Sequence, residues 1–233
     1  MTSESVVLVA HGTEDPVGRG VSERIRDAVA ARLPEVVVDL AYADVVEPRV
    51  GPVLARHPHA TIVPLFLASG YHVRTDLPAI AADHPGARLT APLGPSPALL
   101  PALSDRLAET AAASGVEASG VVLVAAGSSR DCARLQVWSV ADELESRLGI
   151  PVQPAFLNGA SPTLAEARAA LPADARERAV AVSYLLAPGF FQERLARQAT
   201  DLGMPFTAPL ACHPAVVDAV LGLVSTSPTG PSR

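Results

Sequence analysis

The chain has 233 residues and a formal net charge of −6, and its hydrophobic residues make up 49% of the total. Nucleic-acid binding relies on clustered cations, and the sequence has no basic block, so we expect no nucleic-acid partner. No apolar run approaches the roughly 20 residues of a membrane-spanning helix, and the N-terminus lacks the basic start of a secretory signal. We therefore expect a cytoplasmic protein without a membrane partner. The basic residues are all arginine, which excludes a lysine Schiff base.

Strand and helix patterns alternate from the N-terminus onward. Residues 6–10 form a short β-branched run that ends at His11, and residues 16–33 carry apolar side chains four apart, as in an amphipathic helix. The alternation continues with strand candidates at residues 36–41 and 61–67 and helix candidates at residues 49–56 and 77–83. Strands that alternate with helices predict an α/β fold with a parallel sheet.

The sequence contains an internal duplication. Residues 121–127 (VVLVAAG) repeat residues 6–12 (VVLVAHG). Further along, residues 184–191 (YLLAPGFF) repeat residues 65–72 (LFLASGYH). Such self-similarity predicts two similar α/β lobes, each a parallel β-sheet flanked by helices, that face each other across a cleft.

The repeat boundaries predict the domain organisation. We expect an N-terminal lobe at residues 1–116 that carries two expected active-site histidines, His11 and His72. We expect a degenerate C-terminal lobe at residues 117–224. Residues 225–233 are rich in Ser, Thr, Pro and Gly, so we expect a disordered tail there.

Two histidines follow strand candidates. His11 comes directly after the first strand and His72 lies past the end of the third, and ligands of α/β sheets bind outside the carboxyl ends of the strands. The second repeat has Ala126 and Phe191 at the matching positions, so the fold itself does not require imidazole there. Neutral imidazole binds divalent iron, cobalt or nickel and is also a base near neutral pH. Insertion of a metal into a tetrapyrrole needs both abilities, because the ion is held while the pyrrole N–H protons leave.

Other polar residues give weaker signals. Asp44 and Glu47 either assist the metal chemistry or begin the next helix in the ordinary way. His213 lies at a predicted helix start, where it either caps the helix or contacts substrate. Cys132 and Cys212 lack a C-x-x-C spacing, so we expect buried free thiols. Three further histidines in polar, proline-containing stretches are predicted to be solvated loop residues: His57, His59 and His84.

Four segments in this order carry a family resemblance: residues 8–13 (LVAHGT), 42–48 (YADVVEP), 64–72 (PLFLASGYH) with 76–78 (DLP), and 91–94 (APLG). They resemble the class II chelatases of the CbiX/SirB type, the sirohydrochlorin metal chelatases of siroheme and cobalamin synthesis. The resemblance covers nearly the whole chain. It implies the long, two-repeat chelatase fold with an active cleft between the lobes.

The resemblance also implies the activity and the site. It implies an enzyme that inserts Fe2+ or Co2+ into sirohydrochlorin, with His11 and His72 as catalytic residues and metal ligands. No organic cofactor is implied, and the divalent metal is a substrate. The fused repeats indicate that one chain completes the cleft as a monomer. The residues expected to contact substrate are Gly12, Thr13, Asp44, Glu47, Ser69, Gly70 and Tyr71.

The sequence departs from the family pattern at two places. Residues 95–97 (PSP) stand where the family often has a histidine, which leaves that position without an assigned role. The tail lacks the His-rich or cysteine-containing extensions of some cobalt-associated members, which favours iron over cobalt. Four arginines either bind the substrate carboxylates or serve only as surface residues: Arg19, Arg49, Arg74 and Arg130.

Two other functions remain open at this point. The same cleft would also suit a non-catalytic carrier that binds a tetrapyrrole or a metal and hands it on. The segment at residues 10–13 (AHGT) is similar to the Arg-His-Gly start of the histidine phosphatases, but Ala10 stands where that chemistry needs arginine. Turnover separates an enzyme from a carrier, and a phosphatase assay with a metal chelator present tests the third hypothesis.

Overall fold

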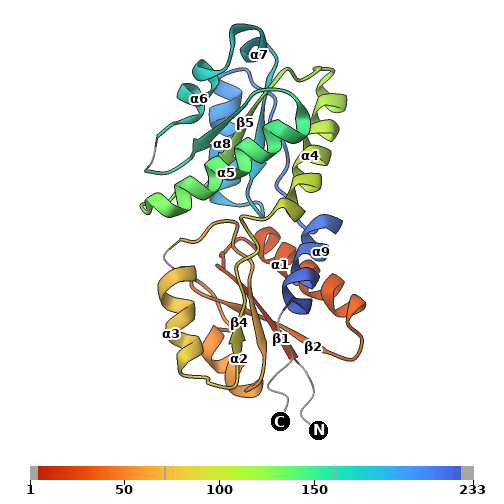
Figure 1. The fold of residues 1–233 in the computed structure, drawn as a ribbon, viewed down its shortest axis with the longest axis vertical. Helices are drawn as coiled ribbons and strands as arrows, with labels where there is room; N and C mark the ends of the chain where they lie inside the picture. Colours follow the sequence, from red (N-terminus) through yellow and green to blue (C-terminus); the bar gives the residue numbers. More distant parts are fainter. Residues whose placement is uncertain (1–4, 71, 160, 227–233) are drawn as a thin grey trace.

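Two separate parallel β-sheets lie one above the other along the long axis of the molecule (Figure 1). They are seen in a computed structural model that describes residues 5–70, 72–159 and 161–226. The first sheet has the strand order β2-β1-β3-β4 and the second has the order β6-β5-β7. Helices flank both sheets (Figure 1), so the predicted α/β fold of two similar lobes is confirmed.

The central strands are buried along their whole length because both of their faces are covered. Every residue of β1 and of β5 is buried, as expected for parallel strands between helical layers. The strands of the first sheet are β1 (Ser5–Ala10), β2 (Val37–Tyr42), β3 (Thr61–Pro64) and β4 (Arg88–Leu89). Those of the second sheet are β5 (Gly120–Ala125), β6 (Val152–Phe156) and β7 (Ala179–Tyr184).

The three helices that the sequence predicted begin and end within one residue of their predicted positions. Those of the first half are α1 (Pro16–Arg32), α2 (Val50–Arg56), the π-helical turn η1 (His72–Asp76), α3 (Leu77–Ala82), the 3-10 turn η2 (Pro97–Leu99) and α4 (Leu100–Ser114). Those of the second half are α5 (Asp131–Leu148), α6 (Leu164–Ala170), α7 (Ala173–Glu177), α8 (Phe190–Asp201) and α9 (Pro214–Ser225).

Two predicted boundaries were wrong. The strand expected at residues 61–67 ends at Pro64, because the chain then turns toward the second lobe, where the Tyr184 hydroxyl donates to the Leu67 carbonyl oxygen. The disordered tail was expected to begin at residue 225, but Ser225 lies in the last turn of α9. Residues 227–233 of that tail lie outside the described residues.

The terminal helix of each repeat packs on the opposite lobe. Helix α4 belongs to the first half in sequence but packs against β7 and α5, whereas α9 belongs to the second half but packs against α1 and β3 (Figure 1). The predicted division at residues 1–116 and 117–224 therefore does not describe the lobes in space. The physical reason is that Leu103 and Val220 bury their side chains against the other repeat's elements.

The exchanged helices join the interior into one core. A single cluster of buried side chains runs from Leu8 of β1 through Leu103 of α4 to Leu123 of β5. The outer faces of the sheets have smaller clusters of their own, built around Val7 in the first lobe and Val122 in the second. The lobes therefore share their largest hydrophobic core.

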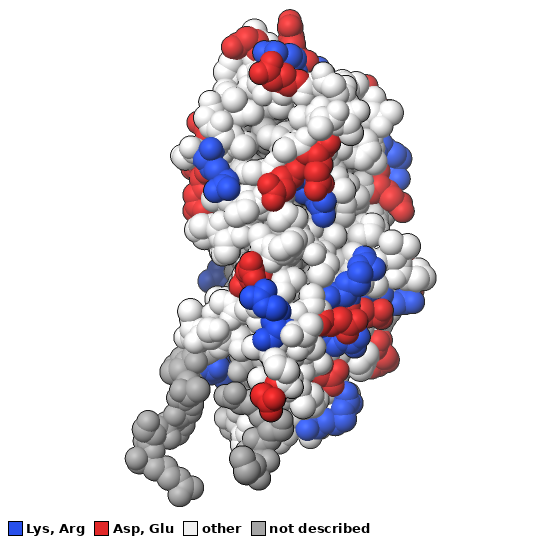
Figure 2. Space-filling view, turned by 90° about the vertical axis from the view of Figure 1, so that its right-hand side faces the viewer, with Lys and Arg blue, Asp and Glu red and all other residues white. Residues whose placement is uncertain are grey.

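The surface mixes charges of both signs. Figure 2 shows acidic and basic side chains interspersed on the face that it presents, with uncharged surface between them. Within the described residues, none of the helices combines the length and the apolar character that a membrane crossing needs.

The shared core predicts that a cavity in α4 destabilises both lobes together. Leu103→Ala is expected to lower the free energy of unfolding by about 2–5 kcal/mol, because the Leu103 side chain is 0% exposed. Urea unfolding followed by the fluorescence of Trp138 on α5 and by far-ultraviolet circular dichroism is expected to show one shifted transition in both signals. Leu135→Ala is the matched control, since that side chain is 67% exposed and should change stability by less than about 0.5 kcal/mol. Two separate transitions would contradict a shared core.

Candidate active site

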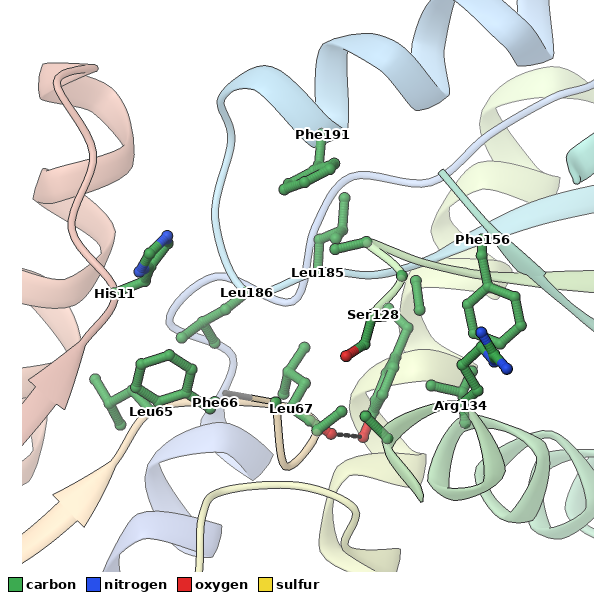
Figure 3. Close-up of a pocket in the computed structure, with 18 residues that line it drawn as sticks. His11, Leu65, Phe66, Leu67, Ser128, Arg134, Phe156, Leu185, Leu186 and Phe191 are labelled. Carbon is green, nitrogen blue, oxygen red and sulfur yellow. Dashed lines mark hydrogen bonds between the residues drawn. The ribbon is translucent and has the colours of Figure 1, made fainter. Parts of the chain in front are cut away.

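A cleft between the lobes opens at the carboxyl ends of the strands (Figure 3). It consists of two adjoining pockets with volumes of about 370 and 510 Å³. The first, here the inter-lobe pocket, is lined by His11, residues 65–68, Gly70, residues 125–128, Ala133, Arg134, Val137, Phe156, residues 184–186 and Phe191. The second, here the α1 pocket, is lined by residues 10–14, Gly18, Arg19, Ser22, Tyr42, Val45, Leu65 and residues 185–191.

His11 lies at the border between the two pockets. It is the first residue after β1, its side chain is exposed, and it belongs to the lining of both pockets. Its ring lies beside Phe66, with 6.3 Å between ring centroids and a tilt of 55°. Leu186 and Phe191 of the second lobe approach the same space from the other side (Figure 3). The exposed imidazole thus faces a pocket that has apolar side chains from both repeats in its lining.

The turn that presents His11 depends on Gly12. Its φ is +98°, and a Cβ added there would lie 2.1 Å from the Asp44 carbonyl oxygen, so no other residue fits without rearrangement. Gly127 of the second repeat has a φ of +95° and would place a Cβ 2.3 Å from the Asn158 carbonyl oxygen. Both repeats therefore keep the turn after the first strand, but only the first carries a histidine on it.

Asp44 and Glu47 are tied to Arg49 beside the cleft. The Arg49 guanidinium lies 3.1 Å from Asp44 Oδ1, and the Arg49 N–H donates to Glu47 Oε2 at 2.8 Å. A hydrogen bond from the Val45 N–H, followed by Arg49 and the nearby charge of His11, lowers the pKa of the Asp44 carboxyl. Asp44 is therefore a carboxylate at neutral pH. In the described lining of the two pockets, Gly12 and Thr13 are present whereas Asp44 and Glu47 are not.

The segment that carries the second predicted histidine is only partly described. Gly70 lines the inter-lobe pocket, and Ser69 binds Gln136 of the second lobe. Tyr71 lies outside the described residues, and for His72 only the backbone is described, where η1 begins. The joint placement of the His11 and His72 side chains therefore stays a prediction. Among the described residues, no group of three or more His, Cys, Asp and Glu side chains is arranged to hold a metal ion.

The arginines divide into those that reach the cleft and those that do not. Arg19 lines the α1 pocket and donates to the Thr13 carbonyl oxygen at 3.2 Å. Arg49 pairs with Asp44 and Arg74 donates to Cys132 Sγ, and neither belongs to the described linings, nor does Arg130. Sequence reasoning missed Arg134, which lines the inter-lobe pocket and pairs with Asp131. It lies one helical turn after Arg130, so only the packing of α5 distinguishes the two.

The apolar wall from the second lobe was also missed. Leu185 and Leu186 follow β7 and line both pockets. Before them, the buried Tyr184 hydroxyl donates to the Leu67 carbonyl oxygen at 2.9 Å, the dashed line in Figure 3. Burial, helped by the charge of Glu143, raises the pKa of Tyr184, so its hydroxyl stays a donor. A Cβ on Gly94 would lie 2.6 Å from this hydroxyl, which explains the glycine of the APLG segment.

The remaining histidines have structural roles or lie at the surface. His213 Nδ1 accepts a hydrogen bond from the Ala215 N–H at 3.1 Å, so the predicted capping of α9 is confirmed. The prediction for His57 was wrong, because its ring is mostly buried and lies 3.1 Å from Asp39. His59 is exposed and His84 is half-buried. Cys132 and Cys212 are free thiols, but both are half-buried rather than buried.

These features define a class of protein: two parallel-sheet α/β lobes with exchanged terminal helices, and a cleft in which a strand-end imidazole faces an apolar wall. The sequence model of the CbiX family matches residues 5–110 and again residues 120–227. The chain belongs to the CbiX family, and the two matches confirm the internal duplication.

Known relatives agree with this assignment. The sirohydrochlorin ferrochelatase of Bacillus subtilis (strain 168) is 23% identical over 240 residues, which are 95% of this chain and 90% of that protein. The sirohydrochlorin cobaltochelatase of Methanosarcina barkeri is 30% identical over 80 residues, 32% of this chain and 62% of that protein. The solved structure of SirB from Bacillus subtilis with Fe3+ has a TM-score of 0.78 at 21% identity, over 95% of this chain and 94% of that one. This last likeness shows the shared fold.

The positive φ of Gly12 predicts that a substitution there lowers stability. Gly12→Ala is expected to lower the free energy of unfolding by at least about 1–3 kcal/mol, because alanine disfavours the positive φ and its methyl group would meet Asp44. Gly51→Ala is the matched control, since Gly51 lies in α2 with no atom near the added Cβ and alanine favours helix. Urea unfolding measures both variants. Equal stability of the two would show that the turn is not strained.

Proposed function

We propose that this protein is a metal chelatase that inserts Fe2+ or Co2+ into sirohydrochlorin. The observation that carries the proposal is the position of His11, which stands at the border of two adjoining pockets in a largely apolar inter-lobe cleft. Membership of the CbiX family and the printed activities of two relatives, a ferrochelatase and a cobaltochelatase, support the choice of substrate.

The lining of the cleft suits a flat, largely apolar ring with charged edges. Leu67, Phe156 and Leu186 offer apolar surface to the faces of a macrocycle, and burying such surface favours binding. Arg19 and Arg134 belong to the linings of different pockets, so together they offer guanidinium groups to carboxylates at different edges of the ring. The ring would therefore span both pockets and pass His11.

His11 supplies the chemistry of the site. A neutral imidazole offers one lone pair, which binds a divalent ion or accepts a pyrrole N–H proton. His72 is the proposed partner, so that both histidines hold the metal ion and, as the ion passes into the ring, accept the pyrrole N–H protons. The Asp44 carboxylate lies close enough to His11 to interact with it electrostatically. Gly12, Thr13, Ser69, Gly70, Tyr71 and Glu47 complete the proposed substrate-contacting set.

One chain contains both repeats and both walls of the cleft, which supports a monomer as the working unit. A cytoplasmic location stays a prediction. A carrier would use the same cleft, but no observed contact favours it over an enzyme, and turnover separates the two. An enzyme metallates many rings per protein molecule, whereas a carrier gives at most one.

Replacing either histidine is expected to abolish most of the activity without unfolding the protein. His11→Ala and His72→Phe install the residue types that the second repeat has at the matching positions, so the fold should accept them. Each should lower kcat at least about 100-fold, as expected when a metal ligand or proton acceptor is lost. The measurement is anaerobic metallation of sirohydrochlorin with Fe2+ or Co2+, followed by absorbance over many enzyme equivalents and corrected for the protein-free rate.

The control is His59→Ala, because His59 is exposed and does not belong to the described lining of the cleft. It should retain wild-type kcat. Wild-type kcat in the double variant of His11 and His72 would refute the assignment of the histidines. Spectral binding without turnover in the wild-type protein would favour the carrier, and no interaction at all would refute the tetrapyrrole substrate.

Loss of the Arg134 guanidinium is expected to weaken substrate binding more than chemistry. Arg134→Gln should raise the KM for sirohydrochlorin about tenfold, the value of one charge-assisted hydrogen bond, and leave kcat within about threefold. Arg197→Gln is the matched control, since Arg197 is also paired with an acid on its own helix but lies outside the described linings. Steady-state kinetics at saturating metal measure both variants, and an unchanged KM for Arg134→Gln would exclude it from carboxylate binding.

A further inference from the structure

Helix α5 of the second lobe holds the segment that leads to His72. The Ser69 N–H donates to Gln136 Oε1 at 2.8 Å, and Gln136 Nε2 donates to Ser69 Oγ at 3.1 Å. One turn earlier on the same face of α5, Cys132 Sγ accepts a hydrogen bond from Arg74 at 2.9 Å. Three hydrogen bonds thus fasten both sides of position 72 to an element of the other lobe.

The two hydrogen bonds between Ser69 and Gln136 have no equivalent at the positions that match these residues in the internal duplication. The two repeats align without a gap from the first strand into the following helix, so Gln136 of α5 corresponds to Val21 of α1. In the other matched segment, Ser69 corresponds to Pro188. Valine has no amide group and proline has no N–H to donate, so the matching pair cannot form these hydrogen bonds.

These two hydrogen bonds occur in the repeat segment that has a proposed catalytic histidine and are impossible in the segment that has none. The segment fastened by Gln136 leads to His72, whereas the segment that begins with Pro188 leads to Phe191. Gln136 is half-buried and does not belong to the described linings of the two pockets, so a direct contact with substrate is not its role. The second repeat therefore has a glutamine where the first has a valine, and this glutamine holds the segment that leads to a proposed catalytic residue.

We propose that Gln136 is a positioning residue, which fixes the backbone at Ser69 and so orients the segment that leads to His72. The inference rests on the proposed function. It gives the second lobe, which lacks both histidines, a part in the reaction beyond shaping the cleft. The chemistry is sensitive to such placement, because misplacement of a catalytic group by about 1 Å lowers rates by up to about 100-fold.

The test compares four proteins: wild type, Gln136→Ala, Gln136→Glu and Leu135→Ala. Gln136→Ala removes both hydrogen bonds. Gln136→Glu keeps two, since a carboxylate accepts from both the N–H and the hydroxyl of Ser69. Leu135→Ala alters an exposed side chain on the same helix. The readouts are hydrogen exchange of the peptide covering residues 69–76, affinity for Co2+ alone from its visible absorbance, and kcat and KM for sirohydrochlorin.

Gln136→Ala is expected to speed exchange in this peptide about tenfold, as the loss of two neutral hydrogen bonds implies. Its affinity for Co2+ should fall at least about tenfold, and its kcat should fall by a similar factor with KM changed less than about threefold. Gln136→Glu should restore most of both values, and Leu135→Ala should match the wild type.

Faster exchange in Gln136→Ala with wild-type Co2+ affinity and kcat would overturn the proposal, because Gln136 would then serve stability only. Equal losses in Gln136→Ala and Gln136→Glu would also overturn it. A wild-type protein that binds Co2+ but does not metallate sirohydrochlorin would refute the proposed function instead. In that case the Co2+ affinities of the four proteins would still decide whether Gln136 positions a metal-binding segment.

Discussion

The exchange of α4 and α9 between the lobes is the constraint on which the rest of the structure depends. Each helix buries its apolar face against the sheet of the other repeat, so the largest core runs through both lobes. Separating the lobes would expose this surface to water, and the hydrophobic effect opposes that strongly. The cleft therefore lies between two sheets that are held in a fixed relation, which a site built from both of them requires.

The two repeats have the same backbone geometry after their first strands but carry different side chains there. The turn after the first strand depends on a glycine with positive φ in both repeats, at Gly12 and at Gly127. The first repeat presents His11 from that turn, and the second presents Ala126. The second lobe therefore contributes apolar side chains to the cleft, whereas the first contributes the imidazole.

The second lobe nevertheless contributes more than a wall. The Tyr184 hydroxyl fixes the Leu67 carbonyl oxygen, and Gln136 binds both polar groups of Ser69. Both contacts act on the chain between β3 and η1, which belongs to the first repeat. The second lobe lacks the proposed catalytic residues, but its side chains hold the backbone of the first repeat near the cleft in place.

The sequence by itself determined the α/β class, the duplication, most strands and helices, and the candidate His11, because these depend on local periodicity and on the comparison of one repeat with the other. It also predicted that both cysteines are free thiols, and the structure adds that both are half-buried. Only the tertiary structure decided that α4 and α9 change lobes, that Arg134 rather than Arg130 reaches the cleft, and that Gln136 holds Ser69. These depend on contacts between residues far apart in the chain, and the hydrophobic pattern of a helix shows that it buries a face but not against which sheet.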